Sequence, residues 1–279
     1  MSKSKVKPQV FLITGAASGI GAATARKLSQ QGCSVVLADI DVAGARAVAA
    51  DLGENACAIE LDITAETSWC QALNWTFERF KRLDVLINNA AIVVTGNARD
   101  VSLDMHQRTM DTNFLGPLKG MLLVLPRFLH QGSGHIVTVC SMTSFLPFPG
   151  IASYGAAKHA LRAFHHALAL EERHSPVHFT IVHPTATETP MLEQEEKDDS
   201  CAFAFVADPV TAEVVADTIL TAIKKRSLEA CMPPEQARPI ARLGTDPKRL
   251  RKMYDQIEAI GKHAQRERRR QHQDEQAQE

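Results

Sequence analysis

The sequence lacks a hydrophobic run long enough to cross a membrane and lacks an excess of charge of one sign. Its most apolar helical stretch, residues 114–130, is interrupted by Lys119 and Arg127 and is shorter than a bilayer span. The formal net charge is -1, so no whole-molecule field attracts nucleic acid or an anionic membrane. These absences exclude membrane anchoring and nucleic-acid binding as expected functions. They favour a small-molecule ligand.

Cysteine pairs at disulfide or metal spacing are also missing. The six cysteines are scattered, with no C-x-x-C, which predicts reduced thiols in a cytoplasmic protein. The apolar stretch Val10–Ile13 is too short for the core of a signal peptide. His165 and His166 are adjacent in sequence and point to different faces, so the eleven histidines predict no metal site.

Aromatic residues are few, and only two of them are tyrosines. Tyr154 lies four residues before Lys158 in a stretch with helical periodicity, so both side chains share one face of the helix. By composition alone this pair could be ordinary helix surface. Whether it serves proton chemistry depends on the residues that accompany it.

Short β-branched runs alternate with longer helical patterns. Strands are predicted at residues 9–14, 34–39, 56–61, 84–88, 135–140, 178–183 and, more weakly, 228–232. Helices are predicted at residues 21–31, 42–52, 65–80, 102–130 and 153–174. Near-continuous apolar strands separated by helices indicate a parallel sheet covered on both faces. Right-handed crossovers then predict an α/β doubly wound Rossmann fold with a central sheet of about seven strands.

No linker rich in proline, glycine or serine divides the chain, which predicts a single domain over residues 9–233 after an extension of residues 1–8. Residues 234–265 predict a C-terminal extension of one or two short helices. Residues 266–279 lack apolar periodicity and predict a disordered tail. Acidic residues flank the run Arg268–Arg270 and no aromatic is interleaved, which indicates a solvated segment rather than a nucleic-acid contact.

A glycine-rich turn follows the first predicted strand. In TGAASGIG, the glycines Gly15, Gly19 and Gly21 permit a tight turn and a close approach of backbone amides to a pyrophosphate. A glycine triplet alone is weak evidence, but its place between a strand and a helix supports a nucleotide site. Ser18 lies inside this turn.

Asp39 ends the second strand, where an acid would accept the ribose hydroxyls of adenosine. Asp41 adds a second carboxylate, and Ser18 stands where a base could have compensated a 2′-phosphate. NAD is therefore favoured over NADP. The alternative is that Asp39 is a solvated acid at the end of a strand.

Polar residues also follow the third and fourth strands. Asp62 and the asparagines of NNAA, residues 88–91, lie at the same predicted edge of the sheet, where open α/β sheets bind ligands. Asp62 could instead cap the helix that follows Thr64. Asn88 and Asn89 could be turn formers, with Asn88 bonded to neighbouring strands.

Ser141 and Asn113 accompany the Tyr154–Lys158 pair. A phenol has a pKa of about 10 and is a poor base at neutral pH, but a nearby ammonium and a positively charged nicotinamide would lower that pKa. Ser141 lies just past the end of the fifth strand and could hold a substrate oxygen against the phenol. Two alternatives remain: Ser141 could cap a loop, and Asn113 could be a buried polar group bonded to backbone.

These motifs together resemble the short-chain dehydrogenase/reductase family. TGAASGIG, Asp39, Asp62, NNAA, Asn113, Ser141 and YGAAK occur in the family's order and spacing, over roughly Gln9 to Met232. The resemblance implies that Tyr154 is the general acid/base, that Ser141 positions the substrate oxygen, and that Lys158 lowers the phenol pKa and binds the nicotinamide ribose. It also implies that Asn113 holds a water linking Lys158 to solvent.

The resemblance further implies which residues contact NAD. They are Gly15, Ser18, Gly19, Ile20, Gly21, Asp39, Asp62, Ile63, Asn89, Ala90, Tyr154, Lys158, Thr187 and Thr189. Thr189 would help seat the carboxamide. The helices that contain Asn113 and Tyr154 would pack between the subunits of a homodimer or homotetramer.

Two positions depart from the family pattern. Ala91 stands where the family has the glycine of NNAG, and Thr185 stands where it has the glycine of Pro-Gly. If those glycines serve positive φ, the substitutions cost strain. If they serve clearance, the substitutions narrow the pocket.

The expected substrate is a neutral, bulky secondary alcohol or ketone, steroid-like or aromatic, because no arginine is placed to clamp a carboxylate or phosphate. A lid over residues 191–209 is also expected. The apolar residues predicted to contact the substrate are Val93, Val94, Met142, Phe145, Leu146, Phe148, Ile151, Phe203, Phe205 and Val206. The alternative is that these residues are core or subunit contacts.

Two other function classes remain open at this stage. One is a lyase or epimerase that retains its nicotinamide cofactor. The other is a non-enzymatic NAD-sensing protein, whose usual mark would be loss of the tyrosine or the lysine. This chain keeps both Tyr154 and Lys158.

Overall fold

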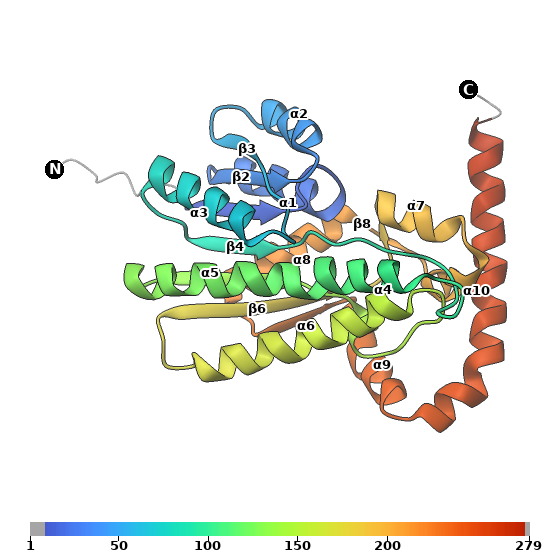
Figure 1. The fold of residues 1–279 in the computed structure, drawn as a ribbon. Coiled ribbons are helices and arrows are strands. Elements are labelled where there is room, and N and C mark those ends of the chain that lie inside the picture. Colours follow the sequence, from blue (N-terminus) through green and yellow to red (C-terminus); the bar gives the residue numbers. More distant parts are fainter. Residues whose placement is uncertain (1–8, 277–279) are drawn as a thin grey trace.

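Seven parallel strands form the central sheet of the computed structural model, which describes residues 9–276 (Figure 1). They are β1 (Val10–Thr14), β2 (Ser34–Asp39), β3 (Ala56–Glu60), β4 (Val85–Asn88), β5 (Gly134–Val139), β6 (Val177–Pro184) and β9 (Glu229–Met232). Their spatial order is β3-β2-β1-β4-β5-β6-β9. The order reverses between β1 and β4, which creates the switch point where ligands of such sheets bind. The predicted doubly wound α/β fold is confirmed.

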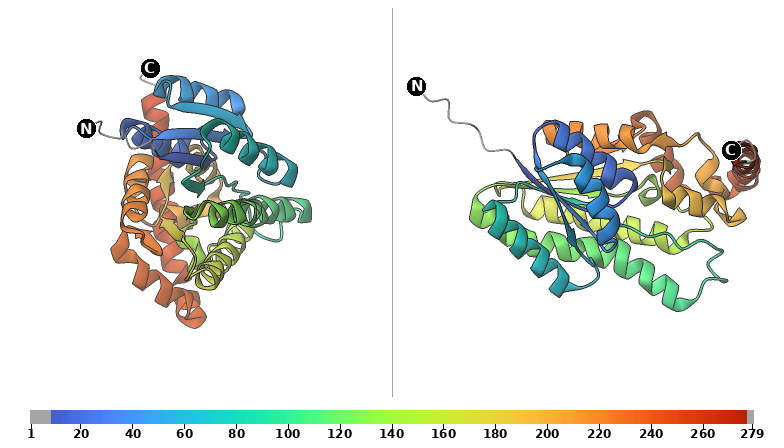
Figure 2. Two further views of the ribbon diagram at one scale, coloured as in Figure 1. Left: turned by 90° about the vertical axis from the view of Figure 1, so that its left-hand side faces the viewer. Right: turned by 90° about the horizontal axis from the view of Figure 1, so that it is seen from above.

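Helices cover both faces of this sheet (Figure 2). One face carries α1 (Gly19–Gln30), α2 (Val42–Leu52) and α8 (Ala212–Lys225), and the other carries α3 (Glu66–Phe80), α5 (Gly116–Gln131) and α6 (Ala152–Glu171). Because successive strand residues point to opposite faces, Leu12 joins one apolar cluster while Phe11 and Ile13 join the other. All five residues of β1 are buried, as expected of a strand covered on both sides.

The stretch predicted as one helix over residues 102–130 contains a change of helical register. It consists of α4 (Leu103–Met110), a π-helical segment η1 (Asp111–Leu115) and α5. Asn113 lies in the middle of the π segment. Single π turns inside α-helices are rare and are frequent at functional sites.

A second group of elements lies beyond the carboxyl ends of the strands. It begins with η2 (Met142–Ser144), after β5, and continues after β6 with β7 (Thr187–Glu188), α7 (Pro190–Glu196), η3 (Asp199–Phe205) and β8 (Val210–Thr211). After β9 follow η4 (Pro234–Gln236), α9 (Ala237–Gly244) and α10 (Pro247–Gln276). In Figure 1, α10 stands upright at the right-hand edge, and the view from above in Figure 2 shows it nearly end-on.

The expectation of a disordered tail is wrong for residues 266–276, which continue α10. This part of the helix is held by hydrogen bonds and ion pairs from Gln265, Arg268 and Arg269 to α7 and η3, rather than by an apolar stripe. The sequence therefore has no apolar periodicity from which this part of the helix could be predicted. Residues 1–8 and 277–279, predicted as an extension and as the end of the tail, lie outside the described residues.

Three properties of residues 9–276 bear on the class of protein. None of their helices is both long and apolar enough to cross a membrane. The six cysteines, which all lie in this range, carry free thiols. A group of three or more His, Cys, Asp or Glu side chains that could hold a metal ion does not occur in this range.

Candidate active site

A large pocket opens at the carboxyl edge of the sheet. It encloses about 1360 Å³, more than the roughly 300–1000 Å³ of a pocket for one drug-sized ligand. There is room for a dinucleotide and a second molecule. Among the predicted site residues, those that line it are Gly15, Ser18, Gly19, Ile20, Asp39, Asp62, Ile63, Asn89, Ala90, Ser141, Tyr154, Lys158, Thr187 and Thr189. Gly21 and Asn113 are not among its lining residues.

The glycine turn between β1 and α1 forms one end of the pocket. Gly15 and Gly19 have φ values of 66° and 52°, a left-handed conformation that glycine adopts without steric cost. Gly21 serves a different purpose, because a Cβ added there would lie 2.1 Å from the carbonyl oxygen of Gly15. Gly21 therefore allows the helix to start directly against the turn, which explains why it lies behind the pocket wall.

The start of α1 is suited to an anion. Ser18 is its N-cap residue, yet the Ser18 side chain forms no capping hydrogen bond, and the first turn contains no acidic residue. Backbone N–H groups at a helix N-terminus carry partial positive charge and lack partners within the helix. This end of α1 fits the diphosphate of a dinucleotide.

Asp39 closes the same end of the pocket. Its Oδ2 accepts a hydrogen bond from the Ala17 amide at 2.9 Å, and its Oδ1 accepts one from the Asp41 amide at 3.0 Å. Each oxygen retains a lone pair for a further donor. Asp41 is not among the lining residues, because its carboxylate caps α2 through the Gly44 amide at 3.0 Å. Asp41 thus stands next to Asp39, as expected from the sequence, and its effect on a 2′-phosphate stays a prediction.

Asp62 and Asn89 connect the ends of β3 and β4 to the pocket. Asp62 Oδ1 accepts hydrogen bonds from both the backbone amide and the hydroxyl of Thr64, which lies before the N-cap residue Ala65 of α3 (Glu66–Phe80). Asp62 therefore does not cap the helix, and it lines the pocket. Asn89 Nδ2 donates to the carbonyl oxygens of Thr14 and Gly15 at 2.9 and 3.0 Å. Asn89 thereby fixes the glycine turn to β4.

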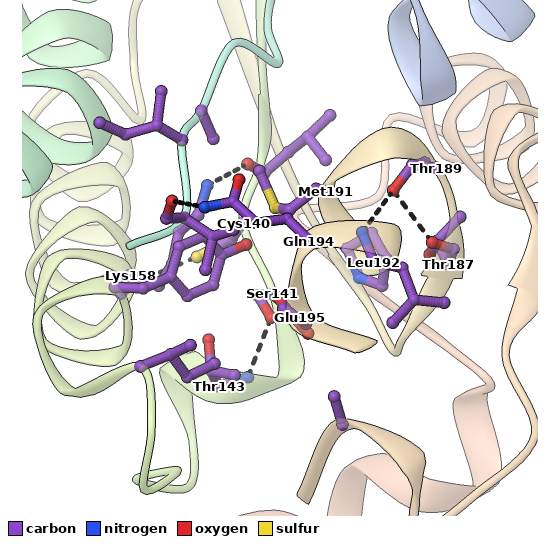
Figure 3. A pocket seen from close by; sticks show the side chains of 18 of the residues that line it. Cys140, Ser141, Thr143, Lys158, Thr187, Thr189, Met191, Leu192, Gln194 and Glu195 are labelled. Atoms are coloured by element: carbon purple, nitrogen blue, oxygen red, sulfur yellow. Dashed lines mark hydrogen bonds between the residues drawn. The ribbon is translucent and has the colours of Figure 1, made fainter. Parts of the chain in front are cut away.

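Tyr154, Lys158 and Ser141 line the other end of the pocket. Figure 3 labels Lys158 and Ser141 there. The two α6 residues are buried, with exposed fractions of 9% for Tyr154 and 2% for Lys158. Lys158 Nζ lies 5.4 Å from the centroid of the Tyr154 ring and donates to the Val139 carbonyl at 3.1 Å. Ser141 Oγ accepts from the Thr143 amide at 3.1 Å, so Ser141 caps η2 and also lines the pocket.

Burial of this cluster favours the neutral forms of the Tyr154 phenol and the Lys158 amine. Burial raises the pKa of the Tyr154 phenol and the nearby Glu195 carboxylate adds to that rise, whereas the Ser141 hydroxyl acts in the opposite direction. Burial lowers the pKa of the Lys158 ammonium. The lowered phenol pKa expected from the sequence includes the charge of a bound nicotinamide, and it stays a prediction.

Asn113 is fully buried and bonded to backbone. Its Oδ1 accepts from the Ile92 amide at 2.9 Å, and its Nδ2 donates to the Ile92 carbonyl at 2.8 Å. The side chain therefore fixes the loop after β4, which contributes Ile92 and Val93 to the pocket wall. This is the buried polar contact that the sequence left open as an alternative.

Ala91 and Thr185, which replace two family glycines, both line the pocket. Neither has positive φ, since among residues 9–276 only Lys81 and Arg226 are non-glycine residues in that region. The two side chains therefore cause no backbone strain. They occupy space that a glycine would leave open.

The wall beyond Ser141 is largely apolar. It includes the predicted residues Val93, Val94, Met142, Leu146, Phe148, Ile151, Phe203 and Val206. Phe145 and Phe205 do not line it. Phe145 lies instead against the Arg162 guanidinium, 4.2 Å from the ring centroid, and against the His183 ring at 4.7 Å.

Several lining residues were not found from the sequence. They are Gln194 and Glu195 in α7, Gln236 in η4, Ile240 and Leu243 in α9, and Ile257 in α10. The spacing of Ile240 and Leu243 on one helix face could have indicated α9. Nothing in the acidic run of residues 193–199 marks Glu195 as the side chain that faces the pocket.

Polar side chains of α10 hold α7 from outside. Gln265, 1% exposed, directs its Nε2 at the carbonyl oxygens of residues 195, 196 and 198 at 2.9–3.2 Å. Arg268 donates to Glu188 at 2.7 Å and to Glu196 at 2.8 Å. Because side chains that bridge two segments restrict their relative motion, these contacts fix the outer wall of the pocket.

An aromatic contact continues this attachment. Tyr254 of α10 stacks on Phe203 with ring centroids 5.3 Å apart, and Phe203 meets Phe148 edge-on at 5.5 Å. Offset and edge-on ring pairs add to the free energy of apolar burial. The C-terminal extension is therefore part of the pocket and not a separate appendage.

Known proteins share this arrangement. A family profile described as short chain dehydrogenase matches residues 9–200. The 3-alpha-(or 20-beta)-hydroxysteroid dehydrogenase of Mycobacterium bovis is 32% identical over 203 residues, which cover 72% of this chain and 78% of that protein.

Solved structures agree on the fold. A short chain dehydrogenase/reductase from Burkholderia phymatum in complex with NAD superposes with a TM-score of 0.80 at 23% identity and covers 87% of this chain and 95% of its own. The 3-ketoacyl-(acyl-carrier-protein) reductase of Brucella melitensis complexed with NADH superposes with a TM-score of 0.74 at 27% identity. The match covers 80% of this chain and 95% of that reductase. From the profile, the relative and the site together, the chain belongs to the short chain dehydrogenase family.

Proposed function

We propose that this protein is an NAD-dependent oxidoreductase that interconverts a bulky, hydrophobic secondary alcohol and its ketone. One observation carries the proposal: a single pocket joins the glycine turn and Asp39 at one end to Tyr154, Lys158 and Ser141 at the other. A hydride carrier and a proton-handling group are the two requirements for alcohol oxidation. The similar hydroxysteroid dehydrogenase supports the class of substrate.

The nucleotide end binds and orients the cofactor. The N-terminus of α1 would hold the diphosphate and Asp39 the adenosine ribose, while Thr187 and Thr189 line the side toward α7. When bound, NAD supplies the hydride acceptor. The protein positions the cofactor and supplies the charges and dipoles that surround it.

The carboxylate of Asp39 favours NAD over NADP. A 2′-phosphate on the ribose would be placed against this negative charge, and the pocket-lining bases, Arg108 and Lys158, come from α4 and α6. A like charge in a partly buried position costs free energy. The discrimination is therefore built into the end of β2.

Proton transfer is assigned to Tyr154. In the direction of oxidation, the substrate hydroxyl gives its proton to the Tyr154 phenolate as the carbinol carbon loses a hydride, and the product is a ketone. Ser141 Oγ donates a hydrogen bond that holds the substrate oxygen. The Lys158 ammonium favours the phenolate, which offsets part of the effect of burial. Asn113 positions the adjoining loop through Ile92.

We also propose a homodimer or homotetramer. Leucines are exposed on α5 and α6, with exposed fractions of 47% for Leu122, 41% for Leu129 and 62% for Leu170. An exposed apolar face on two long helices fits contact with a second copy.

An absorbance assay tests the proposed function. Purified protein is incubated with NAD and a panel of secondary alcohols: steroid alcohols, 1-arylalkanols and substituted cyclohexanols, with lactate and malate as small charged comparisons. Reduction of NAD with members of the bulky group, and slower reduction of NADP, is the expected result. Turnover confined to the small hydroxy acids would contradict the proposed substrate class.

A further inference from the structure

Two neighbouring glutamates at the end of α7 are both buried but have different surroundings. Glu196, 6% exposed, pairs with Arg268 at 2.8 Å and with His272 at 3.1 Å. Glu195, 7% exposed, has no hydrogen bond or ion pair to its carboxylate from any residue in the described range 9–276. Buried carboxylates are normally paired, so the unpaired one calls for a partner.

Glu195 faces the catalytic pocket. It lies beside Ser141 (Figure 3) and lines the same cavity as Tyr154. Its charge raises the pKa of the Tyr154 phenol, although less than burial does. Its backbone carbonyl is held by Gln265 at 3.2 Å. Because α10 fixes the backbone at this position, the carboxylate cannot easily leave the pocket for solvent.

Within residues 9–276, no cation pairs with this carboxylate. The lining bases are Lys158, whose Nζ is bonded to the Val139 carbonyl, and Arg108, which is exposed on α4. Burial without a compensating charge raises the pKa of the Glu195 carboxyl to about 7. A donor that satisfies this group can therefore come from the bound ligand.

We propose that Glu195 is a substrate-binding residue that accepts a hydrogen bond from a second donor on the substrate, a hydroxyl or an amine remote from the reacting carbinol. This inference rests on the proposed function, which places the carbinol at Ser141 and Tyr154. It changes the substrate class from a hydrophobic mono-alcohol to a bulky ring compound with two polar ends. It also disfavours a substrate carboxylate at the second position, because two acids would then face each other.

The decisive experiment measures binding, so it does not depend on turnover. The NADH-loaded protein is titrated calorimetrically with ligands that differ only in the second group. The small set is cyclohexanol, cyclohexane-1,4-diol, 4-aminocyclohexanol and 4-hydroxycyclohexanecarboxylate, and the large set is a steroid 3-ol and the matching steroid 3,17-diol. In at least one set, the second donor should strengthen binding about 10-fold or more, the usual range for a hydrogen bond to a charged group. The ring acid should bind more weakly than cyclohexanol.

Three variants assign the preference to Glu195. Glu195→Gln keeps an acceptor but loses the charge, and should reduce the preference for the amine more than that for the hydroxyl. Glu195→Leu should abolish both preferences and bind the mono-alcohols as well as or better than wild type. Glu193→Gln, an exposed position on the same helix, is the control and should behave as wild type. Equal binding of mono-alcohols and donors in both sets, or a donor preference that survives Glu195→Leu, would overturn the proposal.

Thermal unfolding supplies an independent readout. A carboxyl whose pKa is raised in the folded protein destabilises it as pH rises from the unfolded value of about 4.3 to the folded value. Glu195→Gln should therefore have a higher midpoint than wild type at pH 8, and the difference should fall to roughly a third at pH 5. Equal midpoints at pH 8 would show that the carboxylate already has a partner or is solvated, which also overturns the proposal.

Failure of the proposed function is recorded separately. The same panel is assayed for reduction of NAD, and NADH affinity is measured for each variant. If no alcohol is oxidised but the donor preference depends on Glu195, the proposed reaction fails and Glu195 remains a ligand-binding residue. If alcohols are oxidised without any dependence on Glu195, only the present inference fails.

Discussion

The two ends of the pocket are built by different means. At the cofactor end, three of the wall residues lie at the carboxyl ends of central strands: Gly15 follows β1, Asp39 ends β2 and Asn89 follows β4. At the substrate end, the outer wall comes from α7, η3, α9 and α10, none of which lies in the sheet. One end is held by the strands beneath it, and the other is held by side chains from the C-terminal helix.

This difference implies that the two binding activities are separable. Asn89 Nδ2 donates to the carbonyls of Thr14 and Gly15, and Asp39 accepts from the Ala17 amide, so the hydrogen bonds that hold the glycine turn lie within residues 14–89. The contacts of Gln265 and Arg268 fix α7 over sequence separations of 67 to 80 residues and do not touch the turn. Substitutions at one end should leave affinity at the other nearly unchanged. Tyr154, at the junction, should affect turnover alone.

The largest effect is expected at the junction. Tyr154→Phe removes the hydroxyl that exchanges the proton and leaves the ring packing in place. Turnover should fall about 10²–10⁴-fold, the usual contribution of general acid–base catalysis. NADH affinity, measured by fluorescence titration, should stay within about twofold, because this substitution touches neither the turn nor Asp39. A variant that keeps near-full turnover would contradict the assigned role.

The next effect belongs to the cofactor end. Asp39→Ala removes the proposed ribose acceptor and the charge that opposes a 2′-phosphate. NAD binding should weaken about 10-fold or more, as expected for loss of a hydrogen bond to a charged group, and the ratio of kcat/KM for NADP to that for NAD should rise. Glu60→Ala, an exposed residue at the end of the neighbouring strand, is the control. An unchanged cofactor preference would show that Asp39 does not contact the ribose.

The smallest effect is expected at the substrate end. Gln265→Ala removes the amide that contacts three carbonyls of α7 and η3. The KM for the alcohol should rise about 3- to 10-fold, which corresponds to roughly one net hydrogen bond, while NAD affinity stays the same. Arg270→Ala on the exposed side of α10 should have no effect. Equal weakening of NAD and alcohol binding would mean that α10 stabilises the whole domain and not the substrate wall.

The same contrast explains what the sequence could predict. Strand ends, the glycine turn and the Tyr154–Lys158 spacing are local patterns, because their geometry is determined within a few residues. The positions of Gly15, Gly19 and Asp39 in the pocket follow from the order of the strands alone. The confirmed seven-stranded fold therefore brings these residues to one cavity, whereas the use of the Asp41 carboxylate as the cap of α2 was not predicted.

The substrate end could not be predicted in this way. The unpaired position of Glu195 results from the orientation of a short helix, and α10 is held by contacts with residues far away in sequence. An acidic run and an arginine-rich run each resemble solvated surface when considered alone. Their pairing becomes visible only when Arg268 and Glu196 are brought together. Polar pairs between distant segments produce no periodic pattern within either segment, so they cannot be predicted from one segment alone.

The position of α10 also has a consequence for biosynthesis. The residues proposed to contact the cofactor have all left the ribosome once the chain has grown well past Thr189, and chains fold from their N-terminal side as they are made at about 5–20 residues per second. The wall over the substrate end cannot close until Gln265 and Arg268 have been synthesised and have reached α7. The newly made protein thus passes through a stage in which its nucleotide site is formed and its substrate site is still open to water.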